Sequence, residues 1–159
     1  MNTTSRLHRE SKLPAGITAD AVIAMLHDHN TVVHLNPLVK SVEDIEAPSH
    51  AAEEYKGLPW KKVVDEIAYL PAGIWKGSVE YEACFEDRPN GIKANVWAPM
   101  GLTTSSTWAV IDAKDGEGLV LSEDCETRCS FLMMPFVKKT QNEAHETMVC
   151  GDCEEKCIY

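Results

Sequence analysis

The sequence has little positive charge: 15 Lys and Arg residues stand against 25 Asp and Glu residues, for a formal net charge of −10. Nucleic acids and anionic membrane surfaces are bound through basic patches, so we expect neither as a partner. No segment approaches the run of about 18 apolar residues that a membrane-spanning helix needs. The opening residues, MNTTSRLHRESK, contain no apolar signal core. We therefore expect a soluble cytoplasmic protein without membrane insertion.

The chain also lacks the short motifs of several common enzyme classes. It contains no G-x-S-x-G nucleophile turn, no Walker loop, no G-x-G-x-x-G and no H-E-x-x-H. These motifs supply a serine nucleophile, phosphate-binding loops and a zinc site, respectively. We therefore expect no serine hydrolase, no nucleotide-dependent enzyme, no zincin and no cofactor.

Six cysteines are present, but their positions do not indicate a disulfide framework. Cys84, Cys125 and Cys129 fall within strand-like segments, where a free thiol behaves as a small core hydrophobe. Reduced thiols fit the expected cytoplasmic location.

The other three cysteines form a C-x2-C-x3-C pattern near the end of the chain, at Cys150, Cys153 and Cys157. With His145 upstream, three thiolates and an imidazole form a conceivable tetrahedral zinc site. Only one C-x-x-C is present, and Gly151 interrupts the helix that would orient the ligands. We therefore expect no metal site and a frayed tail over 150–159.

The remaining pattern is a first strand, two short helices, a run of strands and one long helix. Thr18 is an N-cap candidate for the first helix, and the second ends at Asn36-Pro37. Asn90-Gly91 between two alternating runs indicates a β-hairpin. The predicted strands cover 5–13, 39–45, 60–70, 76–86, 92–98, 102–112 and 119–129. The polar loop over 46–59 is interpreted as an insertion in preference to a lid.

The segment 131–149 is predicted to be an amphipathic helix that begins near Met133 or Met134. At about 1.5 Å per residue it would span about 25 Å, which is enough to cross an antiparallel sheet. We expect it to close a cavity against that sheet. With 159 residues and 44% hydrophobic composition, the chain is predicted to form one α+β domain over 1–149, followed by the tail.

Several segments resemble a known superfamily: LPAGITADAVIAMLHDH, LNPLV, YLPAGIWKGSVEYEACF, WAPMGL, SEDCETRC and MPFVKKT. They look like a family of small fungal proteins within the START or Bet v 1-like (SRPBCC) superfamily, which includes polyketide cyclases and lipid-transfer domains. The resemblance implies the helix-grip fold, in which a curved antiparallel sheet of about six to seven strands surrounds a long C-terminal helix. It also implies binding of a hydrophobic ligand, with or without cyclisation chemistry.

Strand alternation selects the residues that would line such a cavity. In 76–86 the set containing Tyr81 and Phe85 is predicted to face inward, and in 60–70 we favour the phase of Asp65 and Tyr69. Trp108 belongs to a similar inward set. The predicted substrate contacts are Tyr81, Phe85, Trp108, Arg128, Met133, Val137 and Gln141. For Arg128 the alternative is an ion pair with Glu126, Glu80 or Glu82.

The predicted catalytic residues are Asp65, Tyr69, Glu123 and His145. An inward carboxylate is desolvated, so its pKa rises toward neutral pH and it can act as a general acid or base. A tyrosine can donate a hydrogen bond to an enolate or carbonyl oxygen. The alternatives are that both carboxylates are paired or face solvent and that His145 is a solvated boundary residue. For His27 and His29 we expect a helix-capping role.

The leading hypothesis is a pocket protein of fungal specialised metabolism that promotes a cofactor-free cyclisation, lactonisation, dehydration or isomerisation of a polyketide-like intermediate. The alternative is a lipid or hydrophobic-metabolite carrier without chemistry. A third interpretation, a structural or regulatory binding protein, predicts a filled core without a cavity. Homodimer formation is left open.

Overall fold

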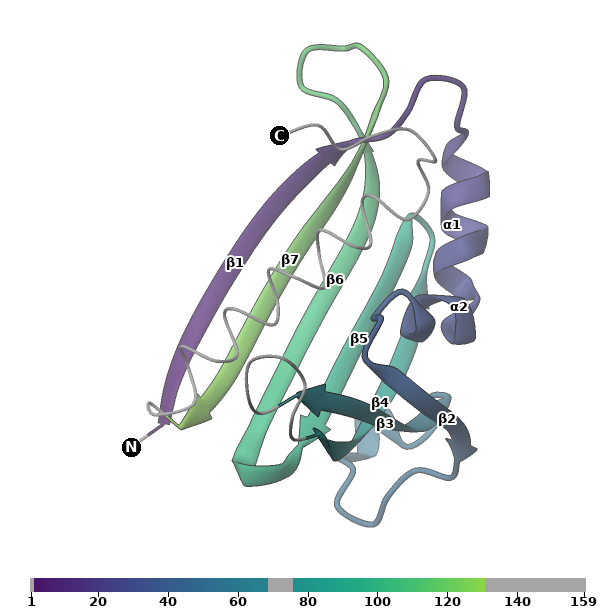
Figure 1. Cartoon of the computed structure of the whole chain (residues 1–159). Coiled ribbons are helices and arrows are strands. Elements are labelled where there is room, and N and C mark those ends of the chain that lie inside the picture. The colour runs from purple at the N-terminus through teal and green to yellow at the C-terminus, as the bar shows by residue number, and fades with distance from the viewer. Residues whose placement is uncertain (1, 69–75, 131–159) are drawn as a thin grey trace.

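A computed structural model describes residues 2–68 and 76–130 of the chain. The strands in this part form one seven-stranded sheet in the order β1-β7-β6-β5-β4-β3-β2, with every neighbouring pair antiparallel (Figure 1). The strands are β1 (Asn2–Lys12), β2 (Val39–Ile45), β3 (Trp60–Ala68), β4 (Lys76–Arg88), β5 (Gly91–Ala98), β6 (Leu102–Asp112) and β7 (Leu119–Ser130). These positions agree closely with the predicted strands. The predicted long helix over 131–149 lies outside the described residues.

The helices α1 (Ala19–His27) and α2 (His29–His34) cover one end of the concave face of the curved sheet (Figure 1). The predicted N-cap of α1 is present, because Thr18 Oγ1 accepts a hydrogen bond of 3.2 Å from the backbone N–H of Ala21. Asp28 caps α2 in the same way, through a hydrogen bond of 3.2 Å from the Thr31 N–H. Two successive caps therefore fix the bend between the helices.

The apolar core lies between α1 and the concave face. Leu26 of α1 and Ile92 of β5 are both 0% exposed. The sheet residues of this cluster alternate along their strands, so each occupies a concave-face position. The buried cluster is formed by Val22, Leu26, Val32, Ala83, Phe85, Ile92, Ala94, Val110 and Leu121.

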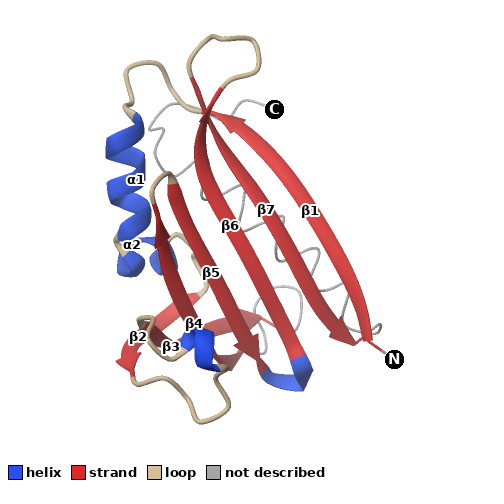
Figure 2. Cartoon of the chain, turned by 180° about the vertical axis from the view of Figure 1, so that it is seen from behind, coloured by secondary structure: helices blue, strands red, loops and turns tan. Residues whose placement is uncertain are grey.

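The loop over 46–59, which includes the short helix η1 (Glu53–Tyr55), packs on the opposite, convex face (Figure 2). Ala51 is buried there against Trp60 and Cys84. The Trp60 indole N–H donates a 2.9 Å hydrogen bond to the Tyr55 carbonyl, and the Trp60 ring stacks on Trp97 with centroids 5.0 Å apart. The loop is therefore an insertion that covers the outer face, and a lid over the concave face is the wrong interpretation.

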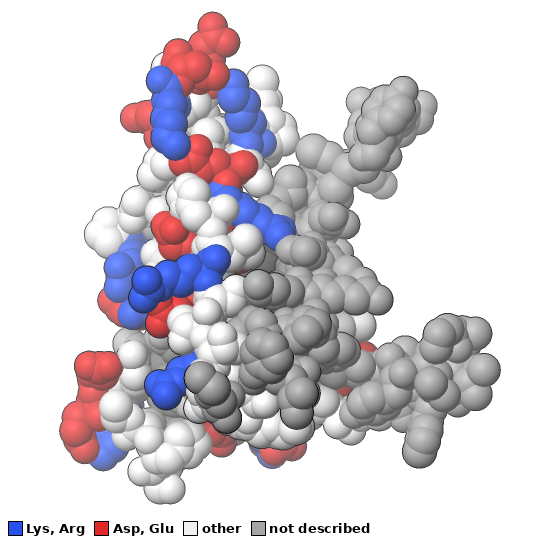
Figure 3. All heavy atoms as spheres, turned by 90° about the vertical axis from the view of Figure 1, so that its left-hand side faces the viewer, with Lys and Arg blue, Asp and Glu red and all other residues white. Residues whose placement is uncertain are grey.

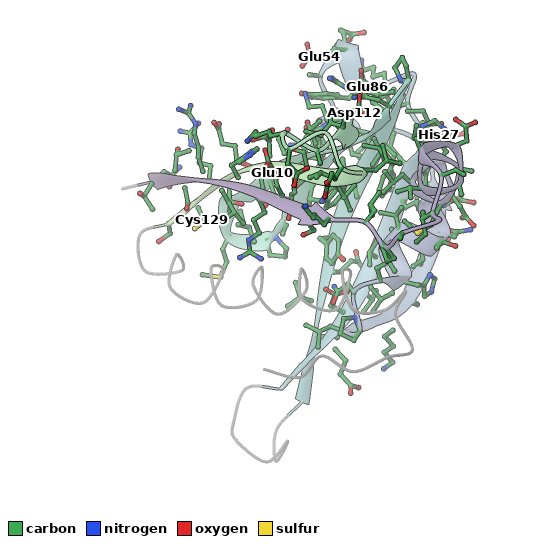
Figure 4. All side chains as sticks on the ribbon, turned by 90° about the horizontal axis from the view of Figure 1, so that it is seen from above. Glu10, His27, Glu54, Glu86, Asp112 and Cys129 are labelled. Atoms are coloured by element: carbon green, nitrogen blue, oxygen red, sulfur yellow. The ribbon has the colours of Figure 1, made fainter. Side chains whose placement is uncertain are left out.

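The histidines at the junction of the two helices contact the sheet. His27 lies in the last turn of α1, as predicted, whereas His29 begins α2, so its predicted place at the end of the first helix is wrong. His27 Nε2 lies 3.1 Å from the Arg88 carbonyl and 2.9 Å from the Gly91 carbonyl, on either side of the β4–β5 turn. His27 projects from α1 in Figure 4. The His29 ring stacks on Phe85 at 4.8 Å. Both imidazoles therefore anchor the helical layer to β4 and β5.

The outer face beside the N-terminal edge carries interleaved charges (Figure 3). Arg6 of β1 pairs with Glu126 of β7 at 2.7 Å, and His8 lies 2.7 Å from Asp124. These side chains are more than half exposed, so each pair adds little to stability. The pairs fit the strand register, in which Arg6 stands opposite Glu126 and His8 opposite Asp124.

The β4–β5 hairpin, predicted from Asn90-Gly91, requires a glycine for a steric reason. A Cβ atom at Gly91 would collide with the carbonyl oxygen of Trp108 in the neighbouring strand. We therefore expect Gly91→Ala to lower the free energy of unfolding by roughly 1–3 kcal/mol, the range seen for overpacking, as measured by urea denaturation.

Gly57→Ala is the matched control, because a Cβ at that position meets nothing within 4 Å. This control should stay within about 0.5 kcal/mol of the wild type. Equal stabilities for the two variants would contradict the steric argument, because they would show that β5 and β6 can move apart at Gly91 without loss of stability.

Candidate functional site

A buried carboxylate marks the candidate site. Asp65 lies in β3 on the concave face and is only 8% exposed. The Asn36 side-chain amide donates a 2.9 Å hydrogen bond to its Oδ2, and the Tyr81 hydroxyl donates one of 3.3 Å to its Oδ1. The inward phase predicted for Asp65 and Tyr81 is therefore observed, and the two side chains are in contact.

The turn after α2 positions Asn36. The Leu38 backbone N–H donates a 3.1 Å hydrogen bond to Asn36 Oδ1, which closes a local turn around Pro37. The Leu38 carbonyl then accepts a 2.7 Å hydrogen bond from the Glu66 N–H of β3. Because the turn is tied to the strand beside Asp65, the Asn36 amide is fixed toward the carboxylate.

Burial raises the pKa of the Asp65 carboxyl, because the charged form is desolvated, while the hydrogen bonds from Asn36 and Tyr81 act in the opposite direction. Burial also raises the pKa of the Tyr81 hydroxyl, and the negative charge of Asp65 adds to this effect. Tyr81 therefore keeps its proton at neutral pH. The site pairs a carboxyl group that can exchange a proton with a phenol that remains a hydrogen-bond donor.

A second polar position lies at the other end of the concave face. Trp108 of β6 stands directly opposite Glu123 of β7, which is 8% exposed. The Trp108 indole N–H is buried, and no group among residues 2–68 and 76–130 accepts a hydrogen bond from it. Through Ile92, this row of residues aligns with Asp87 of β4. Asp87 is six residues from Tyr81 along β4. At about 3.3 Å per residue, the Trp108–Glu123 pair therefore lies roughly 20 Å along the sheet from Tyr81.

The sequence placed all of these residues in one pocket, and the structure corrects that picture. Asp65 and Tyr81 form one cluster, whereas Glu123 and Trp108 form another. Phe85 is 3% exposed and covered by the ring of His29, so it is a core residue and not a substrate contact.

Arg128 is exposed on the convex face, opposite Thr103 and Thr4, so its predicted place in the cavity is wrong. The remaining predicted site residues lie outside the described part of the chain: Tyr69, Met133, Val137, Gln141 and His145.

Sequence reasoning missed two polar residues of the concave face. Asn36 was interpreted only as a helix stop, and its contact with Asp65 spans 29 residues of chain. Lys61 is 5% exposed, and its Nζ lies 2.5 Å from Asp44 Oδ1. The strand phase that turns Asp65 inward also turns Lys61 inward, so the alternation contained this signal.

The described residues give no sign of a metal centre. No group of three or more His, Cys, Asp or Glu side chains in 2–68 and 76–130 is arranged to hold an ion. Cys84, Cys125 and Cys129 are buried and form no disulfide bond within the described residues. The cysteines of the tail lie outside the described residues. Among the helices of the described ranges, none is long and apolar enough to cross a bilayer.

The raised pKa of Asp65 has a consequence for stability. Its folded-state pKa lies above the unfolded value of 3.8, so the folded chain binds the proton more tightly. The contribution of Asp65 to stability is therefore greatest below that value and falls as pH rises through the folded pKa. We expect Asp65→Asn to gain stability relative to the wild type as pH rises from about 4 to 7, as measured by urea unfolding at each pH.

Asp44→Asn provides a control of opposite sign. The hydrogen bond from Lys61 holds the pKa of the Asp44 carboxyl below its usual value, so this group stabilises the fold above that value. The control should lose stability relative to the wild type as pH rises through the acid range below that value, and the difference should stay nearly constant from about pH 4 to 7. If the difference in unfolding free energy between Asp65→Asn and the wild type does not change with pH, the raised pKa of Asp65 is contradicted.

Solved structures with the same architecture share little sequence with this chain. Truncated norcoclaurine synthase from Thalictrum flavum is 15% identical, with a TM-score of 0.58 over 98% of this chain and 97% of that one. Ara h 8.0201 is 13% identical, with a TM-score of 0.59 over 92% of this chain and 96% of that one. The di-domain ARO/CYC StfQ from the steffimycin biosynthetic pathway is 11% identical, with a TM-score of 0.55 over 90% of this chain and 44% of that one. These likenesses establish a Bet v 1-like fold.

A comparison with curated protein sequences gave no significant match. A family model does match, over residues 2–151, which is nearly the whole chain. The chain therefore belongs to the family described as domain of unknown function DUF7053.

Proposed function

We propose that the concave face binds an elongated hydrophobic molecule of polyketide type and promotes a cofactor-free cyclisation, lactonisation, dehydration or isomerisation. One observation carries this proposal: Asp65 is a buried carboxyl with a raised pKa, in contact with a phenol, on the face where a Bet v 1-like sheet offers its concavity. A carboxyl group in this setting suits proton transfer near neutral pH.

The roles of the three clustered side chains follow from their hydrogen bonds. Asn36 occupies Asp65 Oδ2 and orients the carboxylate, while Oδ1 faces Tyr81. Asp65 would take a proton from a carbon next to a carbonyl group, and the electron pair of the broken C–H bond would form an enolate. Tyr81 would turn its O–H from the carboxylate to the enolate oxygen and stabilise the charge there. The enolate carbon would then attack a second carbonyl carbon of the same ligand molecule, and Asp65 would give its proton to the alkoxide oxygen formed there. In an isomerisation, Asp65 would instead return the proton to a different carbon.

The polar groups at the two ends of the concave face favour a long ligand. The buried Trp108 N–H lies roughly 20 Å along the sheet from Tyr81. Val96, which is partly exposed, lies on the concave face between these rows, beside the buried core residues Ala83 and Ala94. An apolar chain that carries oxygen atoms at intervals would cover this surface and supply an acceptor for the indole N–H.

The structural neighbours are compatible with this chemistry. One is named as an ARO/CYC of a biosynthetic pathway and another as a synthase. Glu123, at the far end of the face, is retained as a second candidate acid or base. Tyr69 and His145 are retained for the same role on the sequence argument.

The test uses linear poly-β-ketone thioester mimics, with product formation followed by mass spectrometry. We expect Asp65→Asn to slow product formation by roughly 10²-fold or more, the usual contribution of a general acid or base. Affinity for the mimic should change by only a few fold, because the side chain keeps its shape. Tyr81→Phe should also lower the rate while retaining binding.

Glu126→Gln is the control, since Glu126 is exposed on the convex face. It should leave both the rate and the affinity unchanged. Tight binding without any turnover by the wild type would indicate a carrier of hydrophobic metabolites. Absence of binding would end both interpretations.

A further inference from the structure

The sheet has a notch beside Tyr81. Strand β4 runs from Lys76 to Arg88, but its pairing with β5 ends at Glu82 and Trp97. Strand β5 then stops at Ala98, and the chain turns through the short helix η3 (Pro99–Gly101), while β4 continues along β3 to Lys76. The β4 edge at residues 76–81 is therefore not covered by β5 (Figure 1).

A hollow of about 290 Å³ occupies this notch. His50, Glu82 and Trp97 line it from the convex side, because Glu82 and Trp97 share that face with Trp60 and the 46–59 loop. Tyr81 also lines it, yet this residue has a concave-face register and its hydroxyl contacts Asp65. The hollow thus reaches Tyr81, the residue whose hydroxyl contacts Asp65, although Asp65 itself does not line it.

A second hollow on the outer face provides a contrast. It measures about 460 Å³ and is lined by residues of β1, β5, β6 and β7, among them Arg6, His8 and Thr107. The strands beneath it are paired along their lengths, from Thr107 to Lys93 on one side and to Asp124 on the other. Although it is larger, this hollow ends on continuous sheet, so size alone does not distinguish the notch.

The rim of the notch is firmly built. Trp97 is packed between the ring of Trp60, at 5.0 Å, and the ring of Tyr55, at 5.5 Å. His50 Nε2 lies 3.2 Å from Glu82 Oε2 and joins the 46–59 loop to β4. Figure 4 shows Glu54 of this loop on the same side of the molecule as Glu86 of β4. A fixed rim can act as a size filter.

The outer opening of this hollow, here called the mouth, is bordered by an exposed apolar side chain and by carboxylates. Met100, in the adjacent turn, is 73% exposed and has a left-handed backbone with φ of 62°. A methionine held in this conformation places apolar surface in solvent at some cost in backbone strain. Glu80 and Glu82 add two carboxylates, of which Glu80 has Lys62 at 3.8 Å. The mouth therefore favours uncharged apolar molecules over anions.

We propose that this notch is the entrance through which an uncharged hydrophobic ligand reaches Asp65 and Tyr81. The inference rests on the proposed function, because it supplies the path to the ligand site. The Tyr81 side chain stands where the passage meets the concave face. A bulky group at Ala98, the last residue of β5, narrows the hollow beside Tyr81 while leaving the Asp65 and Asn36 side chains in place.

The experiment measures the rate of binding of Nile red, a neutral apolar dye, by stopped-flow fluorescence. Ala98→Phe should lower the association rate constant by roughly tenfold while changing the equilibrium affinity far less, because a blocked path slows entry and exit alike. Thr107→Phe is the matched control: it adds the same ring to the larger outer hollow and should leave both quantities unchanged. Far-UV circular dichroism and thermal melting verify that both variants are folded.

The acidic rim is tested with 8-anilinonaphthalene-1-sulfonate, an anionic dye. The double variant Glu80→Gln and Glu82→Gln should accelerate its binding several-fold at low ionic strength, with little effect on Nile red. Unchanged Nile red kinetics in Ala98→Phe, with affinity retained, would overturn the entrance and leave the proposed function intact. Failure of the wild type to bind any apolar dye would overturn both.

Discussion

Strand alternation in one curved sheet is the constraint on which the rest of the structure depends. Each strand has a side-chain period of two, so both faces must be covered and each face needs its own partner. Helix α1 covers part of the concave face over Ile92 and Phe85. The 46–59 loop covers part of the convex face over Trp60. A loop that looks superfluous in the sequence is therefore required to bury the outer aromatic residues of β3 and β5.

The same alternation forces a charged group into the interior. Val63 and Asp65 share one face of β3, so a register that buries Val63 at 0% exposure also buries Asp65. Moving the strand by one residue would rescue the carboxylate but expose the valine and bury Glu66 instead. The fold keeps the register and compensates through Asn36 and Tyr81, which solvate the carboxylate with two hydrogen bonds. Those bonds offset the cost of burial only in part, since the pKa of Asp65 remains raised.

Local patterns made most of the architecture predictable. The Thr18 cap, the Asn90-Gly91 hairpin and the alternating strands depend on neighbours within a few residues, and each is found where the sequence indicates it. The inward phase of Asp65 was predictable for the same reason.

The grouping of the site residues was not predictable, because it depends on strand register. Alternation places Tyr81 and Trp108 on one face, but only the offsets between β4, β5 and β6 show that they lie far apart. The prediction that Arg128 binds the substrate was wrong for a related reason. It relied on the charge of the guanidinium group, whereas the position of Arg128 in β7 turns its side chain to the convex face.

A buried acid–base group faces two opposing requirements, and the position of the Asp65 cluster meets both. It must be desolvated for its pKa to rise, yet a ligand must be able to reach it. At the centre of a fully paired sheet the first requirement is easily met and the second is not. At a sheet edge the reverse holds. Tyr81 lies just past the last β4–β5 pair, where the sheet still covers Asp65 through β2 and β4 but no longer closes beside Tyr81. Termination of β5 at Ala98 leaves the β4 edge beside Tyr81 unpaired with β5, and this is where the proposed entrance combines access to the phenol with burial of the carboxylate.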